Sequence, residues 1–326
     1  MVIAVTGANG HVGANLCRAL INKGHQVRAL THRHDNALRS VPIDPVPGDM
    51  LDKASLLRLS QGAQVIFHLA ARISITGDPD GMVSRTNHEG TLNILEAAKQ
   101  SGVKRFIHFS SIHAFRQHPV DQPLDEARPL VDHDGFAYDR SKAAGERAVM
   151  EAAANGLDAL VLSPTAIIGP SDWEPSLTGN AVIDIYNRHI PALIPGGYDW
   201  VDVRDVVDAA IAAIGKGKRG EKYLLAGHWH DLKEFSGLVG KYGGKTTVST
   251  VLPIWTARIG LPFITLYSRL SGTKPLYTSE SLTIISEGSR MISNAKAVRD
   301  LGFRPRPLDE TIRDLISWFR ENGFIQ

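Results

Sequence analysis

The chain has 326 residues, of which 43% are hydrophobic, 21% charged and 7% aromatic, and its formal net charge is +2. This near-neutral balance, without any long basic run, excludes the concentrated positive field of a nucleic-acid-binding protein. Cys17 is the single cysteine and cannot form an internal disulfide, and no secretory leader pattern precedes the first apolar run, so we expect a cytoplasmic protein. The apolar stretch 251–266 is interrupted by Pro253, Arg258 and Pro262, so no membrane span is predicted.

Apolar runs and helical patterns alternate along the first half of the chain. Strands are predicted at 2–5, 26–30, 65–69, 105–109 and 159–162, and helices at 12–23, 51–59, 86–100 and 138–154. Strands that are apolar along their whole length and alternate with helices are typical of a parallel sheet covered on both faces. We therefore predict an α/β fold with a Rossmann-type, doubly wound parallel sheet.

The regular alternation ends after Pro164, and much of the Pro, Gly and Trp content follows it. Helices are predicted at 203–214 and 232–242, the latter started by a capping box of Asp231 and Glu234, and an amphipathic helix is predicted from Asp309 to near the end. We expect residues 1–169 to form a Rossmann-type ligand-binding domain and residues 170–326 a smaller substrate-binding lobe. A buried strand near 222–226 is predicted to rejoin the sheet, so that the two parts are interwoven.

A glycine-rich loop directly follows the first predicted strand and opens the first helix. Gly7, Gly10 and Gly13 are spaced three apart, which allows a tight turn and lets the backbone approach a pyrophosphate at the helix N-terminus. A purely structural turn is the alternative, but the strand and helix context favours dinucleotide binding. The predicted contacts in this loop are Gly7, Asn9, Gly10, His11, Val12 and Gly13.

The end of the second predicted strand bears on the choice between NAD(H) and NADP(H). An NAD-binding chain has Asp or Glu there to accept from the ribose 2′-hydroxyl, whereas here Thr31, His32 and Arg33 follow Leu30. Arg33, with His32 and Thr31, suits a 2′-phosphate, so NADP(H) is expected in preference to NAD(H). The alternative is a solvated loop. Asp49 is placed to meet the adenine edge or, as an alternative, to cap a helix.

Tyr138 and Lys142 lie four residues apart on a predicted helix and therefore on one face of it. A phenol is a poor acid or base near neutral pH, and a neighbouring ammonium favours its ionised form. Ser110 and Ser111 follow the strand 105–109, and ligands of open α/β sheets bind beyond the carboxyl ends of the strands. These side chains are the candidate reaction centre.

Together, and in this order, the motifs resemble the extended short-chain dehydrogenase/reductase superfamily, with its NAD-dependent epimerase/dehydratase-like fold. The resemblance spans nearly the whole chain, and Leu162 to Pro170 is similar to the dihydroflavonol reductase, cinnamoyl-CoA reductase and 3β-hydroxysteroid dehydrogenase branch. It implies Ser111, rather than Ser110, as the catalytic serine, with Tyr138 exchanging a proton and Lys142 binding the cofactor ribose. It also implies cofactor contacts from Met50, Leu69, Ala70, Ala71, Asn87, Pro164 and Thr165. For Asn87, a hydrogen bond at the start of a helix is the alternative.

The resemblance predicts an NADP-dependent oxidoreductase acting on a carbonyl, or on the matching alcohol, of a small and fairly apolar substrate. A nucleotide-sugar epimerase or dehydratase with tightly bound NAD is the alternative, and a non-enzymatic dinucleotide sensor is a weaker one. His113, Arg116 and Ile167 are candidate substrate contacts. His228 and His230 lack further ligands nearby in the sequence, so no metal site is predicted. The segment 251–270 is either a wall of the substrate pocket or a packing surface, such as that of a homodimer; its few charges argue against a membrane-surface role.

Overall fold

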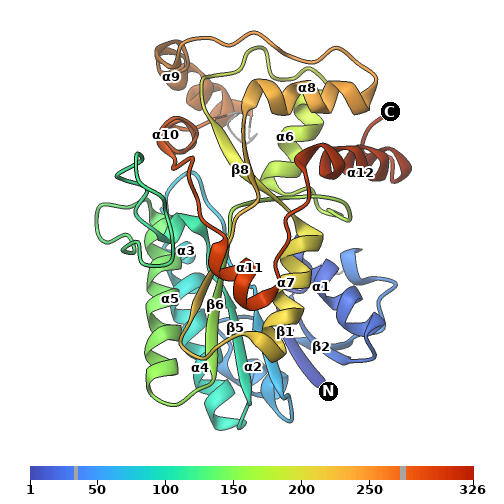
Figure 1. Cartoon of the computed structure of the whole chain (residues 1–326), viewed down its shortest axis with the longest axis vertical. Helices are drawn as coiled ribbons and strands as arrows, with labels where there is room; N and C mark the ends of the chain where they lie inside the picture. Colours follow the sequence, from blue (N-terminus) through green and yellow to red (C-terminus); the bar gives the residue numbers. More distant parts are fainter. Residues whose placement is uncertain (33–35, 272–276) are drawn as a thin grey trace.

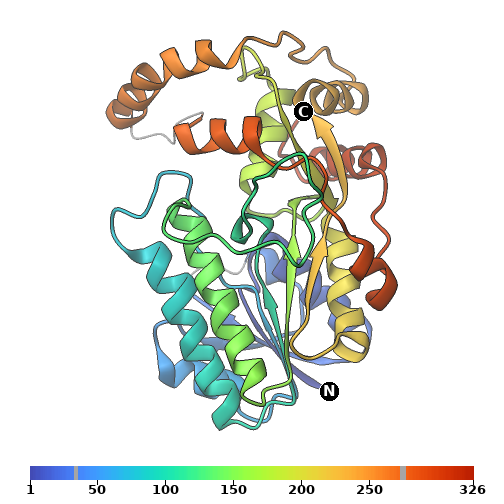
Figure 2. The same ribbon diagram turned by 60° about the vertical axis from the view of Figure 1, so that its left-hand side comes forward.

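A seven-stranded parallel sheet forms the larger part of the molecule (Figures 1 and 2). The computed structural model describes residues 1–32, 36–271 and 277–326, except for the side chains of Asn36, Phe263 and residues 265–271. In spatial order the strands are β3 (Asp44–Pro47), β2 (Gln26–Thr31), β1 (Val2–Thr6), β4 (Val65–His68), β5 (Arg105–Phe109), β6 (Ala159–Pro164) and β9 (Lys222–Leu225). The chain reverses its direction across the sheet between β1 and β4, which is where a doubly wound sheet binds its ligand. The predicted fold class is therefore confirmed.

Helices cover both faces of this sheet, because its strands carry apolar side chains on both sides. One face packs against α1 (His11–Asn22), α7 (Val203–Lys216) and α11 (Ala295–Leu301), with Leu16 and Val206 among the contacts. The other face packs against α2 (Lys53–Ser60), α4 (Gly90–Gln100) and α5 (Ala137–Ala154), with Leu56 and Val149 in that core. Cys17 is fully buried in the first layer, as a small apolar side chain is expected to be.

A smaller lobe lies beyond the carboxyl ends of the strands and has its own core, in which Trp200 stacks on Phe235 with ring centroids 4.1 Å apart. The chain enters this lobe after β6, returns to the sheet for α7 and β9, and ends in the lobe with α12 (Figure 1). Its three-stranded sheet has the order β10 (His228–Asp231), β8 (Gly197–Asp202), β7 (Ala166–Ile168). Its helices are α6 (Leu177–Tyr186), α8 (Leu232–Gly243), α9 (Ile254–Ser271), α10 (Ser279–Glu287) and α12 (Leu308–Glu321).

Several local expectations are refined. The predicted helix 86–100 begins earlier, with α3 (Met82–Ser84) and a π-helical turn, η2 (Arg85–Glu89), before α4. The Asp231 carboxylate accepts the Glu234 backbone N–H at 2.7 Å, which confirms the predicted start of α8. The last helix begins at Leu308, so the predicted start at Asp309 was wrong by one residue. Two 3-10 turns, η1 (Asn36–Leu38) and η3 (Ile112–Ala114), complete the secondary structure of the described residues.

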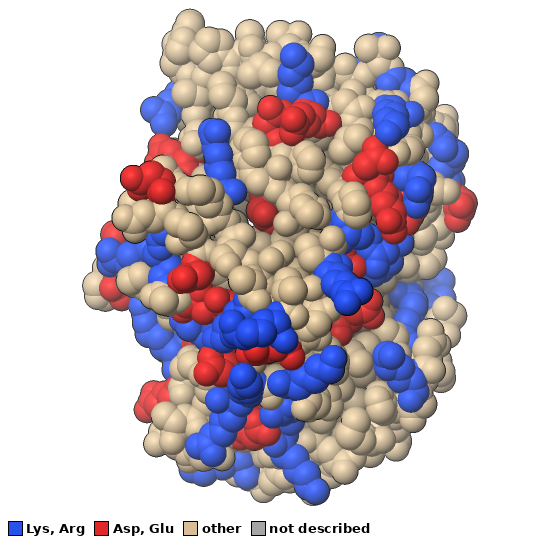
Figure 3. Space-filling view, viewed as in Figure 1, with Lys and Arg blue, Asp and Glu red and all other residues tan. Residues whose placement is uncertain are grey.

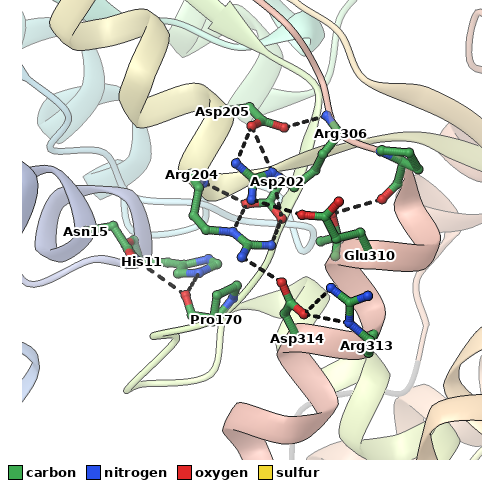
Figure 4. A network of polar contacts seen from close by, with 12 residues as sticks. His11, Asn15, Pro170, Asp202, Arg204, Asp205, Arg306, Glu310, Arg313 and Asp314 are labelled. Atoms are coloured by element: carbon green, nitrogen blue, oxygen red, sulfur yellow. Dashed lines mark hydrogen bonds and ion pairs between the residues drawn. The ribbon is translucent and has the colours of Figure 1, made fainter.

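An ion-pair network fastens α12 to the start of α7 (Figure 4). The Asp202 carboxylate is buried at the end of β8 and accepts from the Arg204 guanidinium at 2.7 Å. Arg204 also donates to Asp314 of α12 at 2.7 Å, and Arg306 donates to Asp205 at 2.8 Å. Charges held in such buried geometry are paired and hydrogen-bonded, so the lobe has a fixed attachment to the sheet domain at this point.

Elsewhere, basic and acidic side chains intermingle over much of the face seen in Figure 3.

Candidate active site

The glycine loop between β1 and α1 adopts a conformation that only small residues permit. Gly7 has a φ of 70°, and a Cβ atom on it would lie 2.6 Å from the Ala70 backbone nitrogen. A Cβ on Gly13 would lie 2.1 Å from the Gly7 carbonyl oxygen. Gly10 is the N-cap of α1, so the first N–H groups of the helix face the end of the loop. This cradle fits an anionic group held by backbone N–H groups.

A pocket of about 160 Å³ opens beside the loop, at the carboxyl ends of β1, β2, β3 and β4. Its walls come from the glycine loop, from the end of β2, from the residues after β3 and from the residues after β4. A pocket in this place, continuous with a helix N-terminus, fits the adenosine and pyrophosphate parts of a dinucleotide. Its lining residues are Gly7, Ala8, Asn9, Gly10, Leu30, His32, Gly48, Asp49, Met50 and Ala70.

The segments that bear on cofactor choice meet at one rim of this pocket. The His32 imidazole lies 3.5 Å from the Asp49 carboxylate, and both side chains are about half exposed. The helix-cap alternative for Asp49 was wrong, because Asp52 caps α2 and Asp49 accepts the Leu51 N–H at 2.8 Å. Arg33, the predicted 2′-phosphate contact, lies outside the described residues. Thr31 is the last residue of β2, and its carbonyl oxygen accepts the Gly48 N–H at 3.0 Å.

A buried hydrogen-bond chain supports the loop from below. The Thr6 hydroxyl lies 2.8 Å from Nδ1 of His68, and Nε2 of His68 lies 2.9 Å from the Thr91 hydroxyl. The Ala70 backbone N–H also donates to the Thr6 hydroxyl, at 3.2 Å. Burial lowers the pKa of His68 to about 3, and the Lys142 charge contributes, so the imidazole is neutral. Sequence reasoning missed this chain, which joins β1, β4 and α4 directly behind the cradle.

Lys142 and Tyr138 come from the first turns of α5, where they meet the end of β5. The Lys142 ammonium is buried and donates to the Phe109 carbonyl oxygen at 2.5 Å. Ser111 follows Phe109 by two residues, and its hydroxyl accepts the His113 backbone N–H at 3.2 Å. The Ser111 hydroxyl lies close enough to the Tyr138 phenol to lower its pKa. Ser110 is buried near the Glu146 carboxyl.

Burial changes the acid–base properties of both helix side chains. Desolvation raises the pKa of Tyr138 to about 12, with the nearby Ser111 hydroxyl acting in the opposite direction. Desolvation also lowers the pKa of Lys142 to about 8, and the nearby Glu146 carboxylate partly offsets this. Both shifts disfavour the charged form of the group, as burial does in general. Near neutral pH the site therefore holds a protonated phenol beside an ammonium that is close to its titration range.

Asn87 has its whole amide group engaged inside the protein. Its Oδ1 accepts the Arg72 N–H at 2.7 Å, and its Nδ2 donates to the Arg72 carbonyl oxygen at 3.0 Å and to the Ser141 hydroxyl at 2.8 Å. Asn87 thus clamps the segment that follows Ala71 against α5. Its amide group therefore holds neighbouring parts of the chain in place and has no hydrogen-bonding group left free for a ligand.

His113 and Asp139 adjoin Tyr138 on the side of η3 and α10. The His113 and Tyr138 rings meet edge to face with centroids 6.3 Å apart, and Nδ1 of His113 lies 3.8 Å from the Asp139 carboxylate. Burial raises the pKa of Asp139 to about 7, and the negative charge of Glu280 adds to the shift. Sequence reasoning missed Asp139 and Glu280, because only the folded lobe brings α10 toward α5. The position of Asp139 directly after Tyr138 was the sole available signal.

The predicted contacts His11, Val12 and Arg116 do not form one group in the structure. Nε2 of His11 lies 3.1 Å from the Pro170 carbonyl oxygen, so this side chain ties α1 to the segment after β7 (Figure 4). Val12 follows it in the first turn of α1. Arg116 forms an ion pair with Asp132 at 3.3 Å on the surface.

The remaining predicted residues follow the ends of strands. Thr165 is buried after Pro164 at the end of β6, and its hydroxyl donates to the Leu225 carbonyl oxygen at 3.4 Å. Ile167 lies in the middle of β7 and packs partly against the main core. Leu69 and Ala71 flank Ala70 after β4, and the Leu69 N–H donates to the Thr6 carbonyl oxygen at 3.2 Å.

Among the described residues, no group of three or more His, Cys, Asp or Glu side chains is arranged to hold a metal ion. His230 pairs with Glu234 at 3.2 Å, and Nε2 of His228 lies 3.4 Å from the Pro305 carbonyl oxygen. Within the same residues, no helix is both long and apolar enough to cross a membrane.

Fold and site together define a nucleotide-binding α/β protein of the NAD(P)-dependent extended short-chain dehydrogenase/reductase type. Residues 3–226 match the NAD dependent epimerase/dehydratase family, and the chain belongs to that family. It is 32% identical to sterol demethylase protein B of Methylococcus capsulatus, with both chains covered completely. It is 28% identical to the 2-alkyl-3-oxoalkanoate reductase of Stenotrophomonas maltophilia over 97% of this chain and 98% of that protein. The UDP-glucose 4-epimerase of Thermotoga maritima shares the fold with a TM-score of 0.80 at 21% identity, covering 99% of this chain and 100% of that one.

Proposed function

We propose that this protein is an oxidoreductase that prefers NADP(H) and reduces a ketone or aldehyde of a small, fairly apolar substrate, or oxidises the matching alcohol. The proposal rests on one observation: Ser111, Tyr138 and Lys142 converge at the carboxyl end of β5, beside the dinucleotide cradle. Two relatives at full length, the sterol demethylase protein and the oxoalkanoate reductase, bear names that refer to apolar substrates, which supports the substrate class.

The cofactor, when bound, supplies or accepts the hydride. The chain's own groups handle the oxygen atom and its proton. The Ser111 hydroxyl accepts from the His113 N–H, so its one proton can turn from the Tyr138 oxygen to the carbonyl oxygen of a bound substrate. The Tyr138 phenol, with its raised pKa, is protonated and donates its proton to that oxygen during reduction. The Lys142 ammonium then stabilises the phenolate that remains.

A screen of ketones, aldehydes and secondary alcohols, followed through the absorbance of the reduced nicotinamide, tests this proposal. With the best substrate, Tyr138→Phe is expected to lower kcat by about 10²- to 10⁴-fold, as loss of a general acid does. Tyr242→Phe, in α8 of the lobe, is the matched control and is expected to keep activity. Near-wild-type turnover by Tyr138→Phe contradicts the role of the phenol. Tightly bound NAD(H) without net cofactor consumption supports the alternative, a nucleotide-sugar epimerase or dehydratase.

A further inference from the structure

A third ionisable side chain follows Tyr138 and Lys142 at the same spacing along α5. Glu146 lies four residues after Lys142, so the three side chains emerge on one face of the helix. The Glu146 side chain is completely buried. A carboxylate is rarely buried in this way unless a cation or hydrogen-bond donors compensate for the lost water. The neighbours of Glu146 therefore decide what this carboxyl group does.

Lys222, the first residue of β9, is paired with Glu146. Its ammonium lies 3.4 Å from a Glu146 carboxylate oxygen, so the pair joins the edge strand of the sheet to the middle of α5. The same ammonium lies 4.8 Å from the centre of the Phe115 ring, which is fully buried. A cation over an aromatic face is attracted by the negative charge density of the ring. Two contacts therefore hold the Lys222 ammonium in place.

Ser110 and Lys142 adjoin the same carboxyl group. Burial raises the pKa of Glu146, whereas the Ser110 hydroxyl and the two lysine charges act in the opposite direction. In return, the Glu146 charge partly offsets the effect of burial on the pKa of Lys142. Lys142, Glu146 and Lys222 thus alternate in charge, and each opposite charge favours the ionised form of its neighbour.

No other carboxylate of the described residues acts on Lys142. The carboxyl of Asp139 lies on the side of η3 and α10 instead. Burial lowers the pKa of His68 in β4 to about 3 and that of His108 in β5 well below its usual range, and the charge of Lys142 adds to both shifts. Both imidazoles are therefore neutral, and the phenol of the candidate active site is protonated. Within the described part of the chain, Glu146 is the counter-charge of Lys142.

We propose that Glu146 is a positioning residue of the candidate active site, whose carboxylate, anchored by Lys222, keeps Lys142 in its ammonium form. This inference rests on the proposed function, because it concerns the charge that stabilises the Tyr138 phenolate. A buried ammonium without a counter-charge loses its proton more easily, and the amine that remains is a poorer partner for a phenolate. Glu146 thereby extends to higher pH the range in which carbonyl reduction is fast.

A purely structural pair is the alternative, because Lys222 and Glu146 also join β9 to α5. Such a pair would contribute to folding without governing the loss of a proton from Lys142. The two roles therefore differ in one measurable property, which is the titration of the Lys142 ammonium.

NMR of the full chain, with lysine labelled with carbon-13 at Cε, measures that titration without substrate or cofactor. The Lys142 signal is identified by its absence from Lys142→Met. Its midpoint in the unchanged chain is expected at about pH 8, and Glu146→Gln should lower this midpoint by about one pH unit or more. Glu151→Gln is the matched control, because Glu151 is an exposed residue of the same helix, and should leave the midpoint unchanged. An unchanged midpoint in Glu146→Gln overturns the inference.

A second variant covers the case in which Glu146→Gln does not fold, because removal of one partner of a buried pair is destabilising. Glu146→Gln combined with Lys222→Met removes both charges together, and circular dichroism and melting curves check that each variant is folded. The Lys142 midpoint should again be lower than in the unchanged chain, because the charge that acts on Lys142 is that of Glu146. A folded double variant with the original midpoint also overturns the inference.

The pH profile of carbonyl reduction is the second readout. In Glu146→Gln, the decrease at high pH should begin about one pH unit lower, whereas at about pH 6 turnover should stay within about threefold of the unchanged enzyme. Turnover that is lowered by the same factor at every pH contradicts the inference and supports the structural pair. If the unchanged chain reduces no carbonyl compound, the proposed function fails, while the titration of Lys142 still decides the role of Glu146.

Discussion

The buried ammonium of Lys142 donates a hydrogen bond to the carbonyl oxygen of Phe109 over 2.5 Å, and so joins the first turns of α5 to the end of β5. This bond fixes the distance between the strand that leads to Ser111 and the helix that carries Tyr138. An ammonium has three N–H groups, so the bond to Phe109 leaves two for other acceptors. Lys142 therefore holds the strand to the helix and still has N–H groups for the catalytic role proposed for it.

Replacing Lys142 with Met removes both the positive charge and the hydrogen bond to Phe109. Turnover is expected to fall by about 10²-fold or more, because the phenolate loses its neighbouring charge. The pH profile is informative as well: the rate of carbonyl reduction in the unchanged enzyme should decrease above pH about 8, where Lys142 loses its proton. The variant should lack that decrease. An identical profile in both proteins contradicts the proposed role.

The free energy of unfolding of Lys142→Met is expected to increase, whereas its turnover decreases. The pKa of Lys142 is lowered on folding, so between pH about 8 and 10.5 the unfolded chain binds more protons and the free energy of unfolding rises with pH. Below pH 8 the fold bears the full cost of the buried charge. Lys142→Met should therefore be more stable at pH 7, by about 1 to 3 kcal/mol, as urea unfolding can measure. A loss of stability indicates that the Phe109 hydrogen bond outweighs the desolvation.

Asp139→Asn is expected to change how stability depends on pH. The pKa of Asp139 is raised to about 7, so the folded chain binds more protons than the unfolded one between pH about 4 and 7, and stability decreases across that window. Above pH 7 a buried carboxylate then faces Glu280 of α10, with His113 of η3 and the neighbouring Arg140 also close by.

The variant removes this cost, so its unfolding free energy at pH 8 should exceed that of the unchanged chain by about 2 to 4 kcal/mol. At pH 3 the two proteins should be nearly equal, because this pH lies below both pKa values and Asp139 is mostly protonated in the folded and in the unfolded state. Asp134→Asn, on an exposed loop, is the control and should have little effect at either pH. A gain for Asp139→Asn that is the same at both pH values indicates a packing effect instead.

The sheet domain was predictable because its strands repeat one simple signal. β1, β4, β5 and β6 are short apolar runs buried on both faces, and helices of regular period separate them. β3 gave no such signal, because Pro45 and Pro47 are typical of an edge strand rather than of a central one. The strands of the lobe escaped notice for a similar reason: β8 and β10 mix aromatic and charged residues in no clean alternation.

Those parts of the candidate site that lie close together in the sequence were predictable from motif spacing. The parts that only tertiary packing brings together were not. Tyr138 and Lys142 share a helix face by spacing alone, and the glycine loop follows its strand directly. The π-helical turn that orients Asn87 has no simple pattern in sequence. Glu280 reaches Asp139 only through the placement of α10 in the lobe, which no local periodicity encodes.

Gly13→Ala tests the geometry of the cradle. The added Cβ would lie 2.1 Å from the Gly7 carbonyl oxygen, which is backbone and cannot move aside cheaply. The loop must shift, so NADP(H) affinity measured by calorimetry should fall by about tenfold or more and the melting temperature should decrease. Gly237→Ala is the matched control in α8, because a Cβ there meets nothing within 4 Å and alanine favours the helix. It should stabilise the protein slightly, by about 0.5 to 1 kcal/mol, and leave affinity unchanged. Normal affinity in Gly13→Ala contradicts the assignment of the loop to the cofactor.

The proposed preference for NADP(H) rests on the end of β2, where no carboxylate follows Leu30 and where His32 pairs with Asp49 at the pocket rim. If Arg33 binds the 2′-phosphate, Arg33→Ala should weaken NADPH binding by about 1.5 to 3 kcal/mol, which is roughly ten- to a hundredfold in the dissociation constant. NADH lacks that phosphate, so its binding should hardly change. Asp49→Asn provides the comparison: an adenine contact is common to both cofactors, so its loss should weaken NADPH and NADH alike. Titration of each protein with each cofactor, at one fixed salt concentration, separates the two patterns. Equal losses in Arg33→Ala, or none, reject the 2′-phosphate contact.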